Sequence, residues 1–148
     1  MRLSIPRFLV VFVIASIAVP AVLFGVSAVF GIDLSSSSLP FIPFMGAATF
    51  EGYRQVEAHQ TMPGSGDMWS AALWMGIVGM LTNLVMGGLF FLVVPGISGG
   101  LAGIPVSILV IGFTITFVVA FLISRLFLWV GARSAFKAVE RAKKETNP

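Results

Sequence analysis

Long apolar runs alternate with short polar connections along the chain. Residues 8–30, 68–94 and 105–130 form three runs that contain no acidic side chain. A helix rises 1.5 Å per residue, so about 20 apolar residues are needed to cross the ~30 Å hydrocarbon core of a bilayer. Each run exceeds that length, which predicts three membrane-spanning helices.

A fourth apolar run, residues 39–56, is a weaker candidate for a span. It is strictly apolar only up to Phe50 and reaches spanning length only when the helix continues through Glu51 to Val56. We therefore expect a short, half-polar second helix that leaves the membrane in this stretch. The four runs together predict an all-α, polytopic four-helix transmembrane bundle, with residues 1–148 forming a single membrane domain.

The connections between the runs carry turn residues. Residues 31–40 read GIDLSSSSLP, and residues 61–67 read TMPGSGD, in which Asp67 is placed to cap the third helix. Residues 95–105 read PGISGGLAGIP and lack the GK[ST] ending of a phosphate-binding loop, so we interpret this segment as a turn.

Composition agrees with a membrane protein. The chain is 57% hydrophobic and 10% charged, whereas soluble domains have about 45–50% apolar and ~25% charged residues. It has no cysteine, which excludes disulfides, thiolate metal sites and iron–sulfur clusters. Its one histidine, His59, cannot provide both axial ligands of a bis-histidine haem, so we expect no cofactor. The basic residues lie beside apolar runs, which favours anionic lipid head groups over nucleic acid as the partner.

The basic residues also predict the orientation. Cytoplasmic loops are enriched in lysine and arginine, and four spans bring all the basic residues outside the spans to one side. We therefore expect a multi-pass protein of a bacterial cytoplasmic (inner) membrane with both termini in the cytoplasm. A cleaved signal peptide is the alternative for the first run, but that run exceeds the usual apolar core of about 7–15 residues. The basic residues concerned are Arg2, Arg7, Arg54, Arg133, Lys137, Arg141, Lys143 and Lys144.

Small residues recur on one face of each long helix. Membrane helices associate through such faces because lipid tails are as apolar as leucine, so close packing supplies the attraction. Each face is expected to pack either inside the bundle or against another protein. The faces consist of Ala18, Ala21, Gly25 and Ala28 in the first helix, Gly76, Gly79, Asn83 and Gly87 in the third, and Gly112, Thr116, Ala120 and Ser124 in the fourth.

Asn83 lies near the middle of the third run. An amide in hydrocarbon needs a hydrogen-bond partner, and Thr114 or Thr116 of the fourth run could provide it. We interpret Asn83 as a packing residue, with a ligand-binding role as the alternative.

The polar end of the second helix, TFEGYRQVEAHQ at residues 49–60, is the strongest candidate for a site. Glu51 and Arg125 are expected about 5–8 Å and ~12 Å inside their helix ends, at similar depths. A charge at the centre of a span costs roughly 2.5–3.5 kcal/mol, which pairing would partly offset. We therefore predict an intramembrane Glu51–Arg125 ion pair. The alternatives are a local pair with Arg54, snorkelling of both side chains to the interface, and a transport or proton-relay role for Glu51.

The same stretch does not support catalysis or metal binding. His59 has no serine and acid beside it to form a nucleophilic site, and Glu51 with His59 lacks a nucleophile. Glu57 and His59 would supply only two metal ligands from a flexible connection. We expect no enzyme activity and an exposed His59.

Residues 131–148 form a basic tail after the fourth span. Its apolar residues share one face of a helix, and its basic residues lie on the other. This pattern predicts an amphipathic extension over anionic lipid, with an acidic protein surface as the alternative partner. The apolar face holds Ala132, Phe136 and Val139, and the basic face holds Arg133, Lys137, Arg141 and Lys144.

Several short motifs together suggest a family. The second helix ends in Phe50, Gly52 and Arg54, a proline-containing link follows, and the last helix ends in Gly-Ala-Arg at residues 131–133. In these features the chain resembles the small bacterial four-helix inner-membrane proteins of the ABZJ-type hypothetical family, and its GARSAFKAVERAKK tail matches best. The resemblance implies fold and location only.

These observations lead to one functional hypothesis and two alternatives. We expect a non-catalytic accessory or assembly subunit that packs its small-residue faces against a larger membrane complex, for which a respiratory or photosynthetic complex is a candidate. A membrane-protein partner or a second copy of the chain would then cover those faces. The alternatives are a small ion-coupled transporter that uses Glu51 and an anionic-lipid-binding envelope protein that uses the basic tail.

Overall fold

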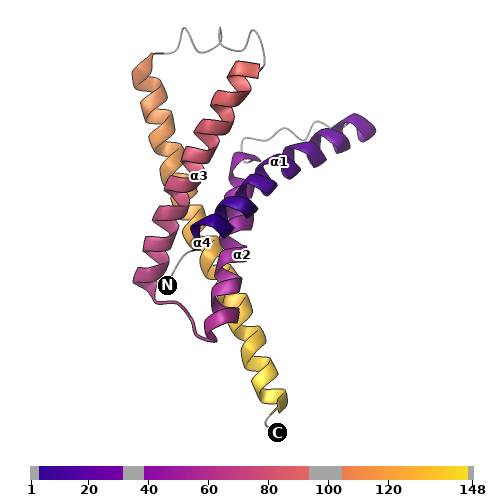
Figure 1. The fold of residues 1–148 in the computed structure, drawn as a ribbon, viewed down its shortest axis with the longest axis vertical. Coiled ribbons are helices and arrows are strands. Elements are labelled where there is room, and N and C mark those ends of the chain that lie inside the picture. The colour runs from indigo at the N-terminus through magenta and orange to yellow at the C-terminus, as the bar shows by residue number, and fades with distance from the viewer. Residues whose placement is uncertain (1–3, 32–38, 94–104, 147–148) are drawn as a thin grey trace.

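The computed structural model describes residues 4–31, 39–93 and 105–146, and in these residues the chain is helical (Figure 1). The described elements are α1 (Ile5–Phe30), the short 3₁₀ helix η1 (Leu39–Phe41), α2 (Ile42–His59), α3 (Ser65–Val93) and α4 (Val106–Thr146). The prediction of an all-α chain with four main helices is confirmed.

Local sequence explains several helix ends. Proline lies in the first turn of α1 and of α2, where its missing N–H has no intrahelical partner to lose. Gly31 ends α1 with a φ of 66°, a left-handed conformation that costs glycine little. Gln60 ends α2 in the same conformation and donates its backbone N–H to Val56 O. The predicted cap Asp67 is instead inside the first turn of α3, where its carboxylate favours the positive end of the helix dipole.

Three of the described helices, α1, α3 and α4, are long and apolar enough to cross a membrane. They make the chain a membrane protein, as the sequence predicts. The second predicted span, residues 39–56, does not meet this criterion, because α2 carries Glu51, Arg54 and Glu57 within 18 residues. Burial recurs every three to four residues along α2, so one face of this helix packs against the rest of the protein. Its buried residues are Pro43, Phe44, Ala47, Ala48, Glu51, Gly52, Gln55 and Val56.

α2 and α4 pack closely against each other. A Cβ atom at Gly52 would overlap the Leu128 carbonyl oxygen, and one at Gly131 would overlap the Thr49 carbonyl oxygen. Both glycines therefore allow the two backbones to touch. The contact continues where Val56 is buried against Ala132 and Ala135, so α2 follows α4 in the same chain direction.

An aromatic core lies where the four helices meet, near the middle of the molecule (Figure 1). Phe12 of α1 meets the edge of the Phe44 ring of α2 at a centroid distance of 4.7 Å. The Phe44 ring lies against the backbone of α3 at Gly79, where a Cβ atom would collide with it. The core thus fixes the first half of α1 and the start of α2 against the middle of α3.

Outside this core the helices separate. The C-terminal half of α3 and the N-terminal half of α4 diverge, and the C-terminal half of α1 projects away from the other helices (Figure 1). Gly25, Gly87 and Gly112, one in each of these segments, have nothing within 4 Å of a Cβ position. Much of the spanning surface is therefore free of contacts within the described chain.

The predicted C-terminal extension is a continuation of α4, which runs unbroken from Val106 to Thr146. Its first apolar residues do not face outward as an amphipathic tail on lipid requires. Ala132 and Ala135 are buried against Val56, and Phe136 packs beside them. The extension is helical as predicted, but α2 covers the beginning of its apolar face, and the end of α4 projects beyond α2 (Figure 1).

Candidate functional site

Glu51 is fully buried and accepts hydrogen bonds from three donors. Arg7 Nε donates to Glu51 Oε2 at 2.8 Å, and Arg7 Nη2 donates to Oε1 at 2.7 Å. The backbone N–H of Ser4 donates to Oε1 at 3.3 Å. A two-pronged contact of this kind combines charge with fixed geometry. It ties the start of α1 to the middle of α2.

The prediction that Arg125 is the partner of Glu51 is wrong. Arg125 was a suitable partner for Glu51 only on the basis of its expected depth. The aromatic core holds the start of α1 against α2, and this arrangement places Arg7 next to the carboxylate. From the sequence, Arg7 contributed only to the predicted orientation of the chain in the membrane. Arg7 precedes the first span at the membrane surface, and the polar end of α2 was expected at the same surface. This shared position could have identified Arg7 as a partner for Glu51.

Arg125 instead lies against uncharged groups of α3. Its guanidinium carbon is 5.2 Å from the centroid of the Trp69 ring, and Nη1 is 3.5 Å from the sulfur of Met68. Its Nε atom is buried and has no hydrogen-bond partner among the residues that the structure describes. A cation–π contact thus holds the side chain on α3, and the alternative of snorkelling to the interface stays a prediction.

A second arginine–tryptophan pair follows on α4. Arg133 lies over the Trp129 ring at 4.9 Å from the centroid. Arg125, Trp129 and Arg133 are spaced four residues apart, so they lie on neighbouring positions of one side of the helix. The sequence alone did not pair either tryptophan with an arginine.

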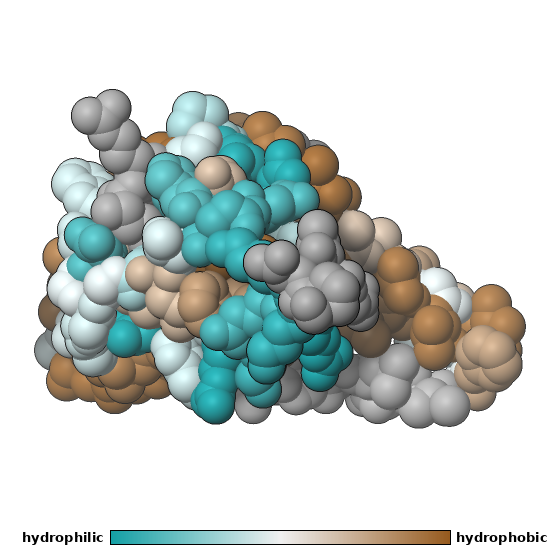
Figure 2. Space-filling model, turned by 90° about the horizontal axis from the view of Figure 1, so that it is seen from below, coloured by the Kyte–Doolittle hydropathy of each residue, from teal (hydrophilic) through white to brown (hydrophobic). Residues whose placement is uncertain are grey.

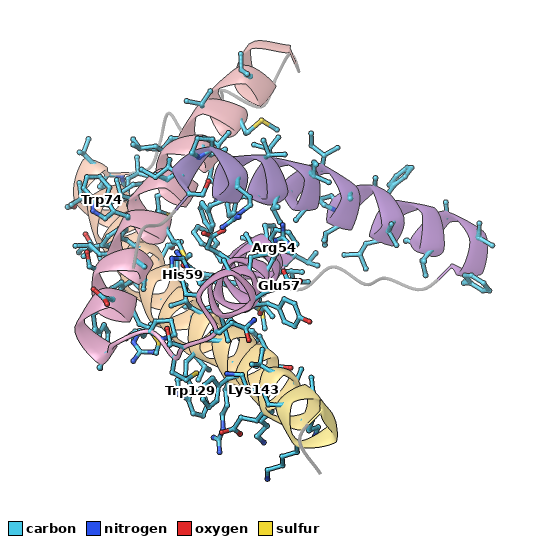
Figure 3. The ribbon with its side chains drawn as sticks, turned by 60° about the horizontal axis from the view of Figure 1, so that its bottom comes forward. Arg54, Glu57, His59, Trp74, Trp129 and Lys143 are labelled. Atoms are coloured by element: carbon cyan, nitrogen blue, oxygen red, sulfur yellow. The ribbon has the colours of Figure 1, made fainter. Side chains whose placement is uncertain are left out.

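The remaining polar residues of TFEGYRQVEAHQ lie on the surface. Arg54 pairs with Glu57, not with Glu51, and both side chains are about half exposed. Figure 3 shows these two beside each other on α2, with His59 apart from them. His59 is exposed, as expected, and its Nδ1 lies 3.1 Å from the carbonyl oxygen of Gln55.

A polar hollow of about 330 Å³ lies where α2 turns into α3. His59 and Asp67 contribute to it, but among the described residues no group of three or more histidine, aspartate or glutamate side chains could hold a metal ion. The hollow is lined by Gln55, His59, Thr61, Met62, Pro63, Gly64 and Asp67.

The predicted small-residue faces of α3 and α4 pack only in part. Gly76 lies against Phe117 and Phe121, and Gly79 lies under Phe44. Ala120 and Ser124 are fully buried. Gly112 is exposed, and Gly87 and Thr116 are half-buried, with no Cβ contact at either glycine. The end of each face near Arg125 is thus internal, and the opposite end is open.

The predicted hydrogen bond from Asn83 is not formed. The Thr114 and Thr116 hydroxyls donate to the carbonyls of Val110 and Gly112 in their own helix. The divergence of α3 and α4 explains this, because it separates Asn83 from both threonines. Asn83 is half-buried on the open part of its face.

The basic side chains of the C-terminal extension are exposed at one end of the molecule. Seen from that end, hydrophilic residues gather in the centre of the surface, and apolar residues lie around them and along α1 (Figure 2). The exposed basic residues are Arg133, Lys137, Arg141, Lys143 and Lys144.

No protein family, curated protein or solved structure matches the chain. The resemblance to the ABZJ-type family therefore stays a prediction, and we infer a function from the geometry of the chain itself.

Proposed function

We propose that the protein is a non-catalytic accessory or assembly subunit that binds a larger membrane complex through the projecting half of α1. One observation carries this proposal: all four small residues on that face of α1 are exposed. They are Ala18, Ala21, Gly25 and Ala28.

The position of these residues on the helix supports the proposal. Phe8 and Phe12 point into the core, and at 100° per residue the small face lies more than a quarter turn away from them. The chain therefore keeps a surface suited to close helix packing and does not use it internally. Lipid tails gain little from such a surface, whereas a neighbouring membrane helix can approach its backbone closely.

The open ends of the α3 and α4 faces extend the same argument. Gly87 and Gly112 leave backbone accessible where the two helices diverge. A partner with several spans, such as a respiratory or photosynthetic complex, could pack against this region as well as against α1. We place the complex in a bacterial inner membrane with both termini of the subunit in the cytoplasm, as the distribution of basic residues predicts.

The geometry favours this role over ion-coupled transport through Glu51. A relay carboxylate must exchange protons or ions with a water-accessible path. Glu51 is fully buried, and both of its oxygens accept hydrogen bonds from Arg7 or Ser4. A carboxylate held in this way supports the fold of α1 on α2.

The test is purification of the full-length protein from its native membrane in a gentle detergent, with mass spectrometry of the co-eluting chains. We expect a defined set of membrane proteins to co-elute with the wild type. The double variant Ala21→Leu with Gly25→Leu should lose them, because leucine side chains separate the two backbones.

The matched control is Val130→Leu, which adds bulk to an exposed position on α4 outside the α1 face and outside the open ends of the α3 and α4 faces. It should co-elute with the same chains as the wild type. A wild-type protein that elutes alone, or an α1 double variant that keeps its partners, would refute the proposal.

A further inference from the structure

The length of α4 identifies the level at which it leaves the membrane. Its 41 residues extend about 60 Å, roughly twice the ~30 Å hydrocarbon core. Arg125 is its first charged residue and lies 19 residues, or about 28 Å, after Val106. Arg125 therefore lies at the boundary between hydrocarbon and head groups, and Arg133 lies about 12 Å further out.

The guanidinium of Arg125 is held at this boundary with part of its hydrogen-bonding capacity unused. No carboxylate in the described part of the chain forms an ion pair with it. Nε is buried, so only the outer nitrogens of this half-buried side chain can reach a ligand. Met68 and Trp69 fix its position but neutralise none of its charge. A cation kept in place without a counter-ion is ready to bind an anion.

The surroundings on α4 fit a lipid anion. Trp129 follows on the same side of the helix at head-group depth, and the guanidinium of Arg133 lies over its ring as a second exposed cation. Leu122 and Val118 lie on this side one and two turns deeper, and both are about half exposed. A molecule with a phosphate at the level of Arg125 can therefore lay acyl chains along apolar side chains beneath it.

We propose that Arg125, Trp69, Trp129 and Arg133 form a binding site for the phosphate of an anionic phospholipid, with its acyl chains on Val118 and Leu122. The site is separate from the α1 face, so the proposal does not depend on the proposed function. It differs from a lipid-binding C-terminal tail, because its central cation is on the spanning part of α4 and is positioned by α3.

The experiment uses the full-length protein and native mass spectrometry. The protein is purified in detergent and incubated with equal amounts of phosphatidylglycerol and phosphatidylcholine, and the retained lipids are counted. We expect the wild type to retain phosphatidylglycerol preferentially. Arg125→Gln should weaken this binding about tenfold, the effect of losing one charge-assisted hydrogen bond.

Arg54→Gln is the control for loss of charge. It removes the same unit of charge from the exposed surface of α2, where Arg54 already pairs with Glu57, and it should leave phosphatidylglycerol binding within about twofold of the wild type. Equal losses for Arg54→Gln and Arg125→Gln would show diffuse surface attraction and overturn the proposal.

Two further measurements need no variant. Wild-type protein that shows no preference for phosphatidylglycerol over phosphatidylcholine refutes the site even when Arg125→Gln fails to fold. Competition with inorganic phosphate identifies the source of the anion. Displacement of the lipid at equimolar phosphate would indicate a soluble anion and overturn the lipid assignment, whereas retention of the lipid at large phosphate excess supports it.

Discussion

At the scale of single residues, Glu51 and Arg125 are accommodated in different ways. Glu51 is fully buried and receives a cation with two parallel hydrogen bonds. Arg125 contacts the Trp69 ring and the sulfur atom of Met68. A buried carboxylate without partners is far less stable than a guanidinium on an aromatic face, because the planar cation is weakly hydrated and stacks well. In the described part of the chain, the ion pair with a fully buried member therefore forms at the acid.

Glu51→Gln tests the structural value of that pair. The substitution preserves shape but removes the negative charge that faces Arg7. Breaking a buried pair costs about 3–5 kcal/mol, and the 37% exposure of the Arg7 side chain reduces this to about 2 kcal/mol. The expected result is a lower melting temperature in detergent, measured by circular dichroism.

Glu57→Gln is the matched control, because it removes the same charge from the exposed pair with Arg54. Its effect should be below about 1 kcal/mol, as for other surface pairs. Equal melting temperatures for the two variants would contradict a stabilising role for the Glu51–Arg7 pair.

At the scale of elements, the contact between α2 and α4 depends on two glycines. Gly52 and Gly131 each lie against a carbonyl oxygen of the facing helix. Such an approach replaces side-chain packing with backbone contact, which suits a short helix that cannot span the membrane alone. The fixed position of α2 in turn supports Glu51 and covers Ala132 and Ala135 of α4.

Gly52→Ala and Gly46→Ala should have opposite effects on stability. Both replace glycine in α2, and alanine raises helix propensity by roughly 0.8–1 kcal/mol in each case. The added methyl group meets nothing within 4 Å at Gly46, whereas at Gly52 it overlaps the Leu128 carbonyl oxygen. We expect Gly46→Ala to raise the melting temperature and Gly52→Ala to lower it. Stabilisation by both variants would show that α2 and α4 do not touch at Gly52.

At the scale of the whole molecule, the helix directions define a topology. α1 and α3 run in one direction, and α2 and α4 run back (Figure 1). The connection after α2 and the C-terminal end of α4 therefore lie on one side of the spanning region, and the end of α1 at Gly31 lies on the other. The basic residues of the extension share the side of the α2–α3 connection.

Single cysteines can test this topology, because the natural chain contains none. Thr61→Cys and Lys143→Cys should react with a membrane-impermeant thiol reagent only from the side that carries the C-terminus. Gly31→Cys should react only from the opposite side. Labelling of the first two positions from opposite sides would exclude the arrangement.

The sequence by itself determined the class, the main helices and the exposed polar end of α2. Apolar runs of spanning length and proline or glycine at helix ends act locally, so they need no knowledge of neighbouring helices. Residues 68–94 and 105–130 correspond to α3 and α4, and His59 is exposed as expected. The small-residue faces were also recognisable, because helical periodicity alone reveals them.

Only the tertiary structure decided which surfaces and charges meet. Depth along a helix permits several partners for Glu51, and the placement of α1 by Phe8 and Phe12 selects Arg7 over Arg125. Gly52 and Gly131 lie on the buried faces of α2 and α4, but only the meeting of the two helices reveals that their backbones touch there. The angle between α3 and α4 likewise determines which parts of the small-residue faces are buried and which are open. Contacts between segments that are distant in the sequence depend on this angle, and no single segment encodes it.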